Sequence, residues 1–257
     1  MRDVLLAIDV GNTQVVVGAH DGNDWCARWR LHTESTRTSD EWASHLGGLL
    51  DSSGLRLREC RNVALSSVVP RVTAALRDMA SAYTRSEPFV VGPGVRTGVR
   101  ILTDNPREVG ADRVVNSLAA RERYGGPAIV VDFGTATTLD VISEEGDYLG
   151  GAIAPGLSIA AEALQSHASK LYEVELLRPA RAIGRNTVEC MQMGIVVGYA
   201  GLVERLVRDT QRELGGPCKV IGTGGLVGVV TQATDAIEHV DPDLTLEGLR
   251  LMYRLNR

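Results

Sequence analysis

The chain has 257 residues, enough for one large domain or two small ones. Acidic residues outnumber basic ones by 32 to 27, so the formal net charge is −5. Nucleic-acid-binding surfaces are typically basic, and we therefore expect no nucleic-acid partner. Glycine is abundant, with 28 residues against a usual share of about 7%. The hydrophobic fraction of 44% and the lack of a Gly-x-y period exclude collagen-like and low-complexity chains.

Signals for targeting, membranes and disulfides are weak. No run approaches about 18 consecutive apolar residues, so we expect no membrane span. The segment 1–11 contains Asp3 and Asp9 and has no small-residue cleavage site, which does not fit a signal peptide. The four cysteines are scattered without a CxxC pair, which argues against zinc and redox motifs and favours the cytoplasm.

The first half of the chain alternates strand and helix patterns. An apolar run at Val4–Ile8 and a second at Val15–Val17 are joined through a glycine turn and predict a hairpin. Thr38 and Glu41 have the spacing of a capping box, which predicts a helix to about Asp51. The further expected elements are strands at Trp25–His32, Val63–Val69 and Phe89–Val91, a helix from Pro70 to Tyr83, a loop from Gly92 to Pro106 and a helix starting near Ala111.

The middle of the chain repeats its opening. A strand pattern runs into Asp132-Phe-Gly-Thr135, as the first runs into Asp9-Val-Gly-Asn12, and both continue into a second strand and an acidic-glycine turn. The two aspartates are 132 − 9 = 123 positions apart, nearly half the chain. A repeat of this size duplicates a domain-sized unit and predicts two α/β lobes. The remaining expected elements are a helix from about Ser158, a long helix after Asn186 with an apolar stripe suited to the lobe core or to a subunit contact, a strand at Lys219–Ile221 and a helix from Leu244 to Arg257.

The repeated Asp-x-Gly turn predicts phosphate binding. Glycine lets the backbone turn tightly and direct N–H groups toward an anion, while the carboxylate at the strand end can hold a cation. A single copy is more often only a hairpin. Two copies at half-chain spacing, with a third glycine-rich turn at Gly222–Gly225, favour a cleft in which two lobes bind a polyphosphate from both sides.

Other nucleotide and metal motifs are missing. There is no Gly-Lys dipeptide and hence no Walker A loop, and Val227 stands where a dinucleotide-binding fingerprint needs its third glycine. The five histidines show no metal-ligand spacing.

Besides the glycine turns, the chain contains the following motifs in order: Asp9–Thr13, Ser66–Pro70, Asn105-Pro106, Val109–Arg113, Val131–Thr138, Gly150–Ile153, Pro155-Gly156 and Thr223–Gly225. Together these motifs resemble one family. The chain is similar to type III pantothenate kinases from Leu5 to about Tyr253. This resemblance implies a duplicated ribonuclease H-like (actin-like) α/β fold, with lobes at 1–118 and 119–243 and the helix 244–257 packing back on the first lobe. It also implies a homodimer.

The resemblance further implies transfer of the ATP γ-phosphoryl group to pantothenate, the first step toward coenzyme A, with Mg²⁺ and a monovalent cation such as K⁺ or NH₄⁺. Asp112 corresponds to the general base, Asp9 lies near Mg²⁺, directly or through water, and Asp132 corresponds to the monovalent-cation ligand. The implied ATP contacts are Asp9, Val10, Gly11, Asn12, Thr13, Gln14, Val15, Val16, Gly134 and Thr135, and the implied pantothenate contacts are Thr103, Gly110, Ala111, Asp112, Arg113 and Thr187.

Each of these residues also has a structural interpretation. Asp112 suits phosphoryl transfer, which needs a carboxylate to accept the alcohol proton, but acidic residues are also favoured in the first turn of a helix. Thr187 has the same alternative after Asn186, and Asp132 has the alternative of closing a strand. Thr103 stands where many family members have an aromatic residue, so a kinase with another small acceptor, or a degenerate nucleotide-binding relative with a regulatory role, are the two alternatives.

Overall fold

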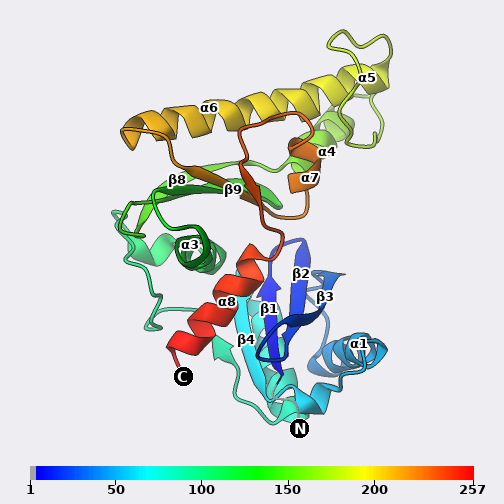
Figure 1. The fold of residues 1–257 in the computed structure, drawn as a ribbon. Helices are drawn as coiled ribbons and strands as arrows, with labels where there is room; N and C mark the ends of the chain where they lie inside the picture. Colours follow the sequence, from blue (N-terminus) through cyan, green and yellow to red (C-terminus); the bar gives the residue numbers. More distant parts are fainter. Residues whose placement is uncertain (1–3) are drawn as a thin grey trace. The chain divides into compact units, whose positions relative to one another are not determined.

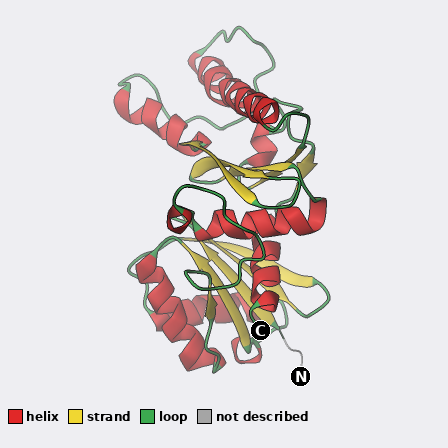
Figure 2. Cartoon of the chain, turned by 90° about the vertical axis from the view of Figure 1, so that its left-hand side faces the viewer, coloured by secondary structure: helices red, strands yellow, loops and turns green. Residues whose placement is uncertain are grey.

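The computed structural model describes residues 4–257, which divide into two compact units (Figure 1). The first comprises the chain up to Gly98 together with Asn105–Ala119 and Thr245–Arg257, and the second comprises Val99–Asp104 and Ala120–Leu244. Each unit contains one five-stranded sheet with helices packed on it (Figure 2).

The sheet of the first unit is mixed, with strand order β3-β2-β1-β4-β5. Strand β1 is antiparallel to β2 and parallel to β4, so the chain enters by a hairpin and returns beside its first strand. The bounds are β1 Leu5–Val10, β2 Gln14–His20, β3 Trp25–His32, β4 Asn62–Ser67 and β5 Phe89–Val90, with helices α1 Ser39–Ser52, α2 Pro70–Met79 and α8 Leu244–Leu255, a short π-helix at Ala80–Thr84, and 3₁₀ turns at Leu57–Glu59 and Pro106–Glu108.

Local chemistry places α1 where the sequence predicts it. The Thr38 hydroxyl accepts a hydrogen bond from the Glu41 amide at 3.3 Å, and the Thr38 amide donates to Glu41 Oε2 at 2.7 Å. This reciprocal pair satisfies two amides at the helix start. The helix then buries Trp42 and Leu46 against the sheet core.

The sheet of the second unit repeats the first. Read from β8, its order is β8-β7-β6-β9-β10, with antiparallel pairs β6/β7 and β7/β8 and parallel pairs β6/β9 and β9/β10. The duplication predicted from the paired aspartates is confirmed. The bounds are β6 Ala128–Phe133, β7 Ala136–Ile142, β8 Tyr148–Pro155, β9 Lys219–Thr223 and β10 His239–Val240, with helices α4 Leu157–His167, α5 Thr187–Gln192, α6 Gly198–Glu213 and α7 Val227–Val230, and a short π-helix at Met193–Val197 between α5 and α6. Helix α3, Ala111–Tyr124, begins in the first unit and ends in the second.

The helical run Thr187–Glu213 is apolar as well as long. Its 18-residue window of mean hydropathy 1.3 is long and apolar enough to cross a membrane, although glycines interrupt its apolar runs. In the structure 39% of that window is buried. Met191, Ile195 and Val203 pack in the core of the second unit, so this stripe serves the core.

Strand β8 was not expected from the sequence, which predicts only glycine turns around Gly150 and Gly151. Glycine weakens the strand signal because it has no side chain to show alternation. Pairing with β7 determines this strand, with Asp140 opposite Gly151 and Val141 opposite Gly150.

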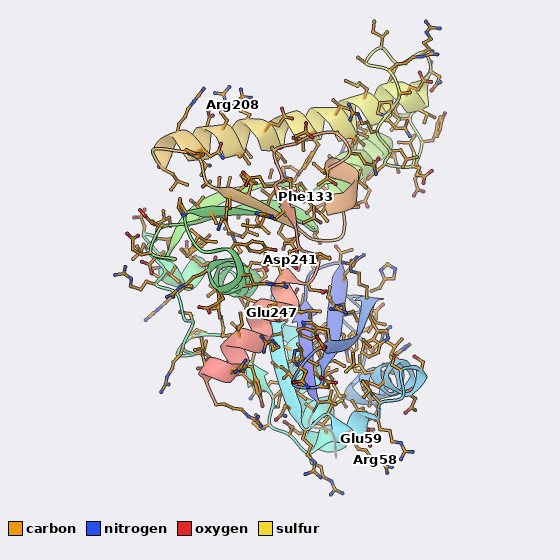
Figure 3. The ribbon with its side chains drawn as sticks, in the orientation of Figure 1. Arg58, Glu59, Phe133, Arg208, Asp241 and Glu247 are labelled. Atoms are coloured by element: carbon orange, nitrogen blue, oxygen red, sulfur yellow. The ribbon has the colours of Figure 1, made fainter. Side chains whose placement is uncertain are left out.

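A buried carboxylate ties the end of α3 to the segment before α8 in the second unit (Figure 3). Asp241, almost fully buried, accepts hydrogen bonds at Oδ2 from Arg123 Nη1 at 2.6 Å and from Tyr124 Oη at 3.0 Å. Burial and this carboxylate raise the pKa of Tyr124. A buried carboxylate is stable when it is paired in this way.

Candidate functional site

The turn between β1 and β2 is held by backbone hydrogen bonds. The Gly11 amide donates to the Gln14 carbonyl at 2.9 Å. Thr33 secures the same turn from the end of β3, since its hydroxyl donates to the Gly11 carbonyl at 2.7 Å and its amide to the Thr13 carbonyl at 2.9 Å. Asn12 and Thr13 are left exposed at the tip. A rigid turn with exposed donors is suited to an anion. No motif in the sequence indicated Thr33.

The turn between β6 and β7 is its counterpart. The Gly134 amide donates to the Ala136 carbonyl at 3.1 Å, with Thr135 half-buried at the tip. In register, Asp132 lies opposite Thr138 in this hairpin, as Asp9 lies opposite Val16 in the other. The two aspartates therefore occupy equivalent places in the two sheets. Phe133, labelled in Figure 3, ends β6 where this turn begins.

Two further glycines pack on the second turn. A Cβ atom on Gly156, which follows β8, would lie 2.1 Å from the Thr135 carbonyl oxygen. A Cβ on Gly224, which follows β9, would lie 2.5 Å from Asp132 Oδ1 and 2.6 Å from the Phe133 amide nitrogen. Gly224 also has a φ of +91°, which side chains rarely adopt. Two glycine-bearing segments therefore pack on this glycine turn. The sequence singled out all three segments but did not show that they pack together.

The donor chemistry of both aspartates fits the implied cations. Among residues 4–257 no three His, Cys, Asp or Glu side chains converge as a metal site. Mg²⁺ commonly takes only one or two carboxylate ligands and completes its shell with water and phosphate oxygens. The half-buried carboxylate of Asp9 could be such a ligand. At Asp132 the glycine backbone of Gly224 approaches so closely that any side chain would fill the space beside the carboxylate.

Asp112 is the second residue of α3. Its Oδ1 accepts a hydrogen bond from the Arg113 amide at 2.9 Å. A Cβ on Gly110 would lie 2.5 Å from the same oxygen. Glycine is therefore needed at position 110 for the carboxylate to fold back over the helix start. Gly110, Asp112 and Arg113 are all half-buried, so the carboxylate remains within reach of a ligand.

Thr103 belongs to a short segment that pairs with β8. Ile101 forms a parallel bridge with Tyr148, and the Leu102 amide donates to the Tyr148 carbonyl at 2.8 Å. The methyl group of Thr103 faces Gly150 of β8, 3.7 Å from where a Cβ would stand. Its hydroxyl oxygen is buried and has no hydrogen-bond partner among residues 4–257. A buried hydroxyl without a partner is a candidate for contact with a ligand.

Thr187 is the first residue of α5, behind the N-cap Asn186, whose Oδ1 accepts from the Glu189 amide at 2.9 Å. It is exposed and borders an open hollow of about 500 Å³ that Leu164 and Met191 also line. The hollow has room for a small molecule.

The expected site residues divide between the two units. The structure places Asp9, Val10, Gly11, Asn12, Thr13, Gln14, Val15, Val16, Gly110, Ala111, Asp112 and Arg113 in the first unit, and Thr103, Asp132, Gly134, Thr135 and Thr187 in the second.

Comparisons with known proteins identify similar sequences and similar folds. A family model described as type III pantothenate kinase matches residues 5–209. Enzymes of that description from Moorella thermoacetica and Myxococcus xanthus are 53% and 50% identical to this chain, each over 98% of it and over 100% and 99% of their own lengths. Two solved structures share the fold: the inorganic polyphosphate/ATP-glucomannokinase of an Arthrobacter species (TM-score 0.55, 14% identity, 99% and 100% coverage) and the activator of the 2-hydroxyisocaproyl-CoA dehydratase of Clostridium difficile (TM-score 0.53, 12% identity, 98% and 94% coverage).

Proposed function

The chain belongs to the type III pantothenate kinase family, and from this premise we propose that it transfers the γ-phosphoryl group of ATP directly to the primary hydroxyl of pantothenate. The observation that carries the proposal is the pair of equivalent turns that follow Asp9 and Asp132 in two sheets of the same topology. Duplicated turns of this kind suit a ligand with several phosphates.

The two turns bind the nucleotide. In the first, the backbone and exposed side chains from Asp9 to Val16 contact the phosphates; in the second, Gly134 and Thr135 do so. The fixed hydrogen bonds of each turn support this role, because a rigid set of donors loses little entropy when an anion binds.

Asp112 acts as the general base. Its Oδ1 is held by the Arg113 amide, so the carboxylate is oriented before the substrate arrives. The proton of the pantothenate hydroxyl passes to this carboxylate as the oxygen attacks phosphorus, and the bond to the ADP leaving group breaks.

Pantothenate is bound by Gly110–Arg113, Thr103 and Thr187. The guanidinium of Arg113 suits a carboxylate or phosphate oxygen. The buried Thr103 hydroxyl supplies a directional hydrogen bond to a polar group of the substrate. Thr103 replaces the aromatic residue found in many relatives, so we expect a hydrogen bond in place of a stacked or packed ring.

Cations neutralise phosphate charge in this proposal. Asp9 would hold Mg²⁺, and Asp132 would hold K⁺ or NH₄⁺. These cations supply electrostatic stabilisation of the negative charge on the transferred group. Asp9 and Asp132 bring the required oxygen ligands to the ends of β1 and β6.

We also propose a cytoplasmic homodimer. Strand β8 is an edge strand of its sheet. It exposes Ile153, and Ile159 of the following helix is also exposed, so apolar side chains are available there for a subunit contact. All four cysteines are free thiols, as expected for a protein of a reducing compartment. Light scattering of the purified chain tests the dimer: a mass near 27.6 kDa would contradict it.

The decisive test is ADP release with ATP and Mg²⁺, with and without pantothenate and K⁺. We expect release that requires pantothenate and yields 4′-phosphopantothenate. ADP release with another small alcohol or acid from an acceptor panel, and none with pantothenate, would favour a different acceptor. Nucleotide binding without turnover on any acceptor would favour a regulatory relative.

A further inference from the structure

Ser66, at the end of β4, lies directly beside Asp9. In the parallel pairing of β1 with β4, Asp9 and Ser66 are partners in register. Partners in adjacent strands carry their side chains on the same face of a sheet. The Ser66 hydroxyl therefore shares a face and a level with the Asp9 carboxylate.

That face is distinct from the apolar core face. Leu6, Ile8 and Leu65, which alternate with Asp9 and Ser66, belong to the core cluster beneath α1 and α2. The opposite face is covered by α8, because a Cβ on Gly18 would lie 2.9 Å from the Leu246 side chain, and α8 runs beside β1 and β4 in Figure 1. Ser66 and Asp9 lie on this second face, at the carboxyl ends of their strands.

The Ser66 hydroxyl is buried and unsatisfied. The residue is 0% exposed, and its Oγ has no hydrogen-bond partner among residues 4–257. Packing does not require a hydroxyl there, since Ala64, two positions earlier on the same face, is also fully buried. Native proteins rarely leave a buried hydroxyl unpaired, so such a group points to a ligand or an ordered water.

The neighbouring serine provides the contrast. Ser67 faces the core side, where its hydroxyl accepts from the Val69 amide at 3.1 Å and from the Thr73 hydroxyl at 2.7 Å. These bonds fix the start of α2. The Ser67 hydroxyl is therefore structural, whereas no such contact accounts for Ser66.

We propose that Ser66 is a positioning residue whose hydroxyl hydrogen-bonds a water molecule in the shell of the Mg²⁺ ion that Asp9 binds. This inference rests on the proposed function. Mg²⁺ keeps several of its waters when it binds a protein, and each bound water must donate its protons. A hydroxyl beside the single carboxylate can accept one of them, which an alanine cannot.

The test compares Ser66→Ala, Ser66→Thr and Ser67→Ala with the wild type by calorimetric titration of AMP-PNP, with and without Mg²⁺. Melting temperatures of the ligand-free proteins are measured in parallel. For Ser66→Ala we expect an unchanged affinity for AMP-PNP without Mg²⁺. The gain in AMP-PNP affinity that Mg²⁺ produces should be about three- to tenfold smaller than in the wild type, and the melting temperature should be equal or higher. Ser66→Thr restores the Mg²⁺ effect, and Ser67→Ala melts lower but keeps it.

An undiminished Mg²⁺ effect in Ser66→Ala would overturn the proposal, as would a fall in melting temperature matching that of Ser67→Ala. These outcomes are separate from the proposed function. A wild type that binds AMP-PNP with Mg²⁺ but does not phosphorylate pantothenate would refute the kinase assignment and leave the serine comparison intact.

Discussion

Gly156 lies so close to Thr135 that a Cβ atom at position 156 would stand 2.1 Å from the Thr135 carbonyl oxygen. That oxygen is backbone in the phosphate turn of the second sheet and cannot rotate away. The segment after β8 therefore supports the turn that follows β6, and only glycine allows the approach.

We expect Gly156→Ala and Gly224→Ala to displace this turn, lowering stability by about 1–3 kcal/mol or more and weakening ATP binding. Gly134→Ala should be milder, because its Cβ would meet the Ala136 oxygen at an ordinary 3.5 Å. Denaturant unfolding and calorimetric ATP titration measure both effects.

Gly47 of α1 is the matched control, since a Cβ there meets nothing within 4 Å. Gly47→Ala should stabilise the helix by about 0.5–1 kcal/mol and leave ATP binding unchanged. If Gly156→Ala behaves like this control, the proposed support of the turn is wrong.

Asp112→Asn should lose most turnover while retaining nucleotide affinity, because the amide keeps the shape of the carboxylate but cannot accept the proton. Gly110→Ala should have a similar kinetic effect by a different route, since its Cβ would stand 2.5 Å from Asp112 Oδ1 and push the carboxylate aside. ADP-release kinetics and AMP-PNP titration separate turnover from binding. Full activity in Asp112→Asn would exclude it as the base.

Thr103→Val tests the acceptor site. The substitution preserves shape and removes a buried hydroxyl that has no partner among residues 4–257. We expect the KM for pantothenate to rise about three- to tenfold, as for one lost hydrogen bond, with the KM for ATP unchanged. The ligand-free melting temperature should hold or rise. An unchanged KM for pantothenate would remove Thr103 from the binding site.

His20 makes stability depend on pH. Burial, followed by the nearby Arg250, lowers the pKa of His20 below its ordinary 6.5, and its Nδ1 accepts a hydrogen bond from the Gly22 amide at 3.0 Å. Just below pH 6.5, His20 therefore binds a proton in the unfolded chain but stays neutral in the folded chain. The contribution of neutral His20 to the free energy of unfolding should be fully present above pH 6.5 and should fall as the pH drops toward the folded-state pKa.

Urea unfolding between pH 8 and pH 5 measures the slope of the free energy of unfolding against pH. His20→Asn retains an acceptor for the Gly22 amide and should flatten the slope, although losing the edge-to-face contact with Trp25 at 5.0 Å lowers overall stability. His32→Asn, at an exposed position, should leave the slope unchanged. An equal slope in His20→Asn and the wild type would rule out His20 as its source.

The sequence was sufficient for the duplication, the hairpins and the start of α1. Those features depend on short-range patterns: Asp9 and Asp132 each precede a glycine turn, and Thr38 and Glu41 are three residues apart. It was insufficient for β8, where Gly150 and Gly151 hide the strand alternation, and for Val99–Asp104, which lies in the second unit beside that strand. Strand β8 is determined by its pairing with β7, and the placement of Val99–Asp104 by the bridge from Ile101 to Tyr148, which is 148 − 101 = 47 positions away.

The sequence by itself determined the family, the paired Asp-x-Gly turns and the candidate base, because these are carried by residue types at short, fixed spacings. Only the tertiary structure decided that Thr33 secures the first turn, that Gly156 and Gly224 pack on the second, and that Ser66 stands unsatisfied beside Asp9. Each of these relationships joins segments that are distant in the chain, so it depends on which backbone atoms the folded sheets bring within a few ångströms of one another.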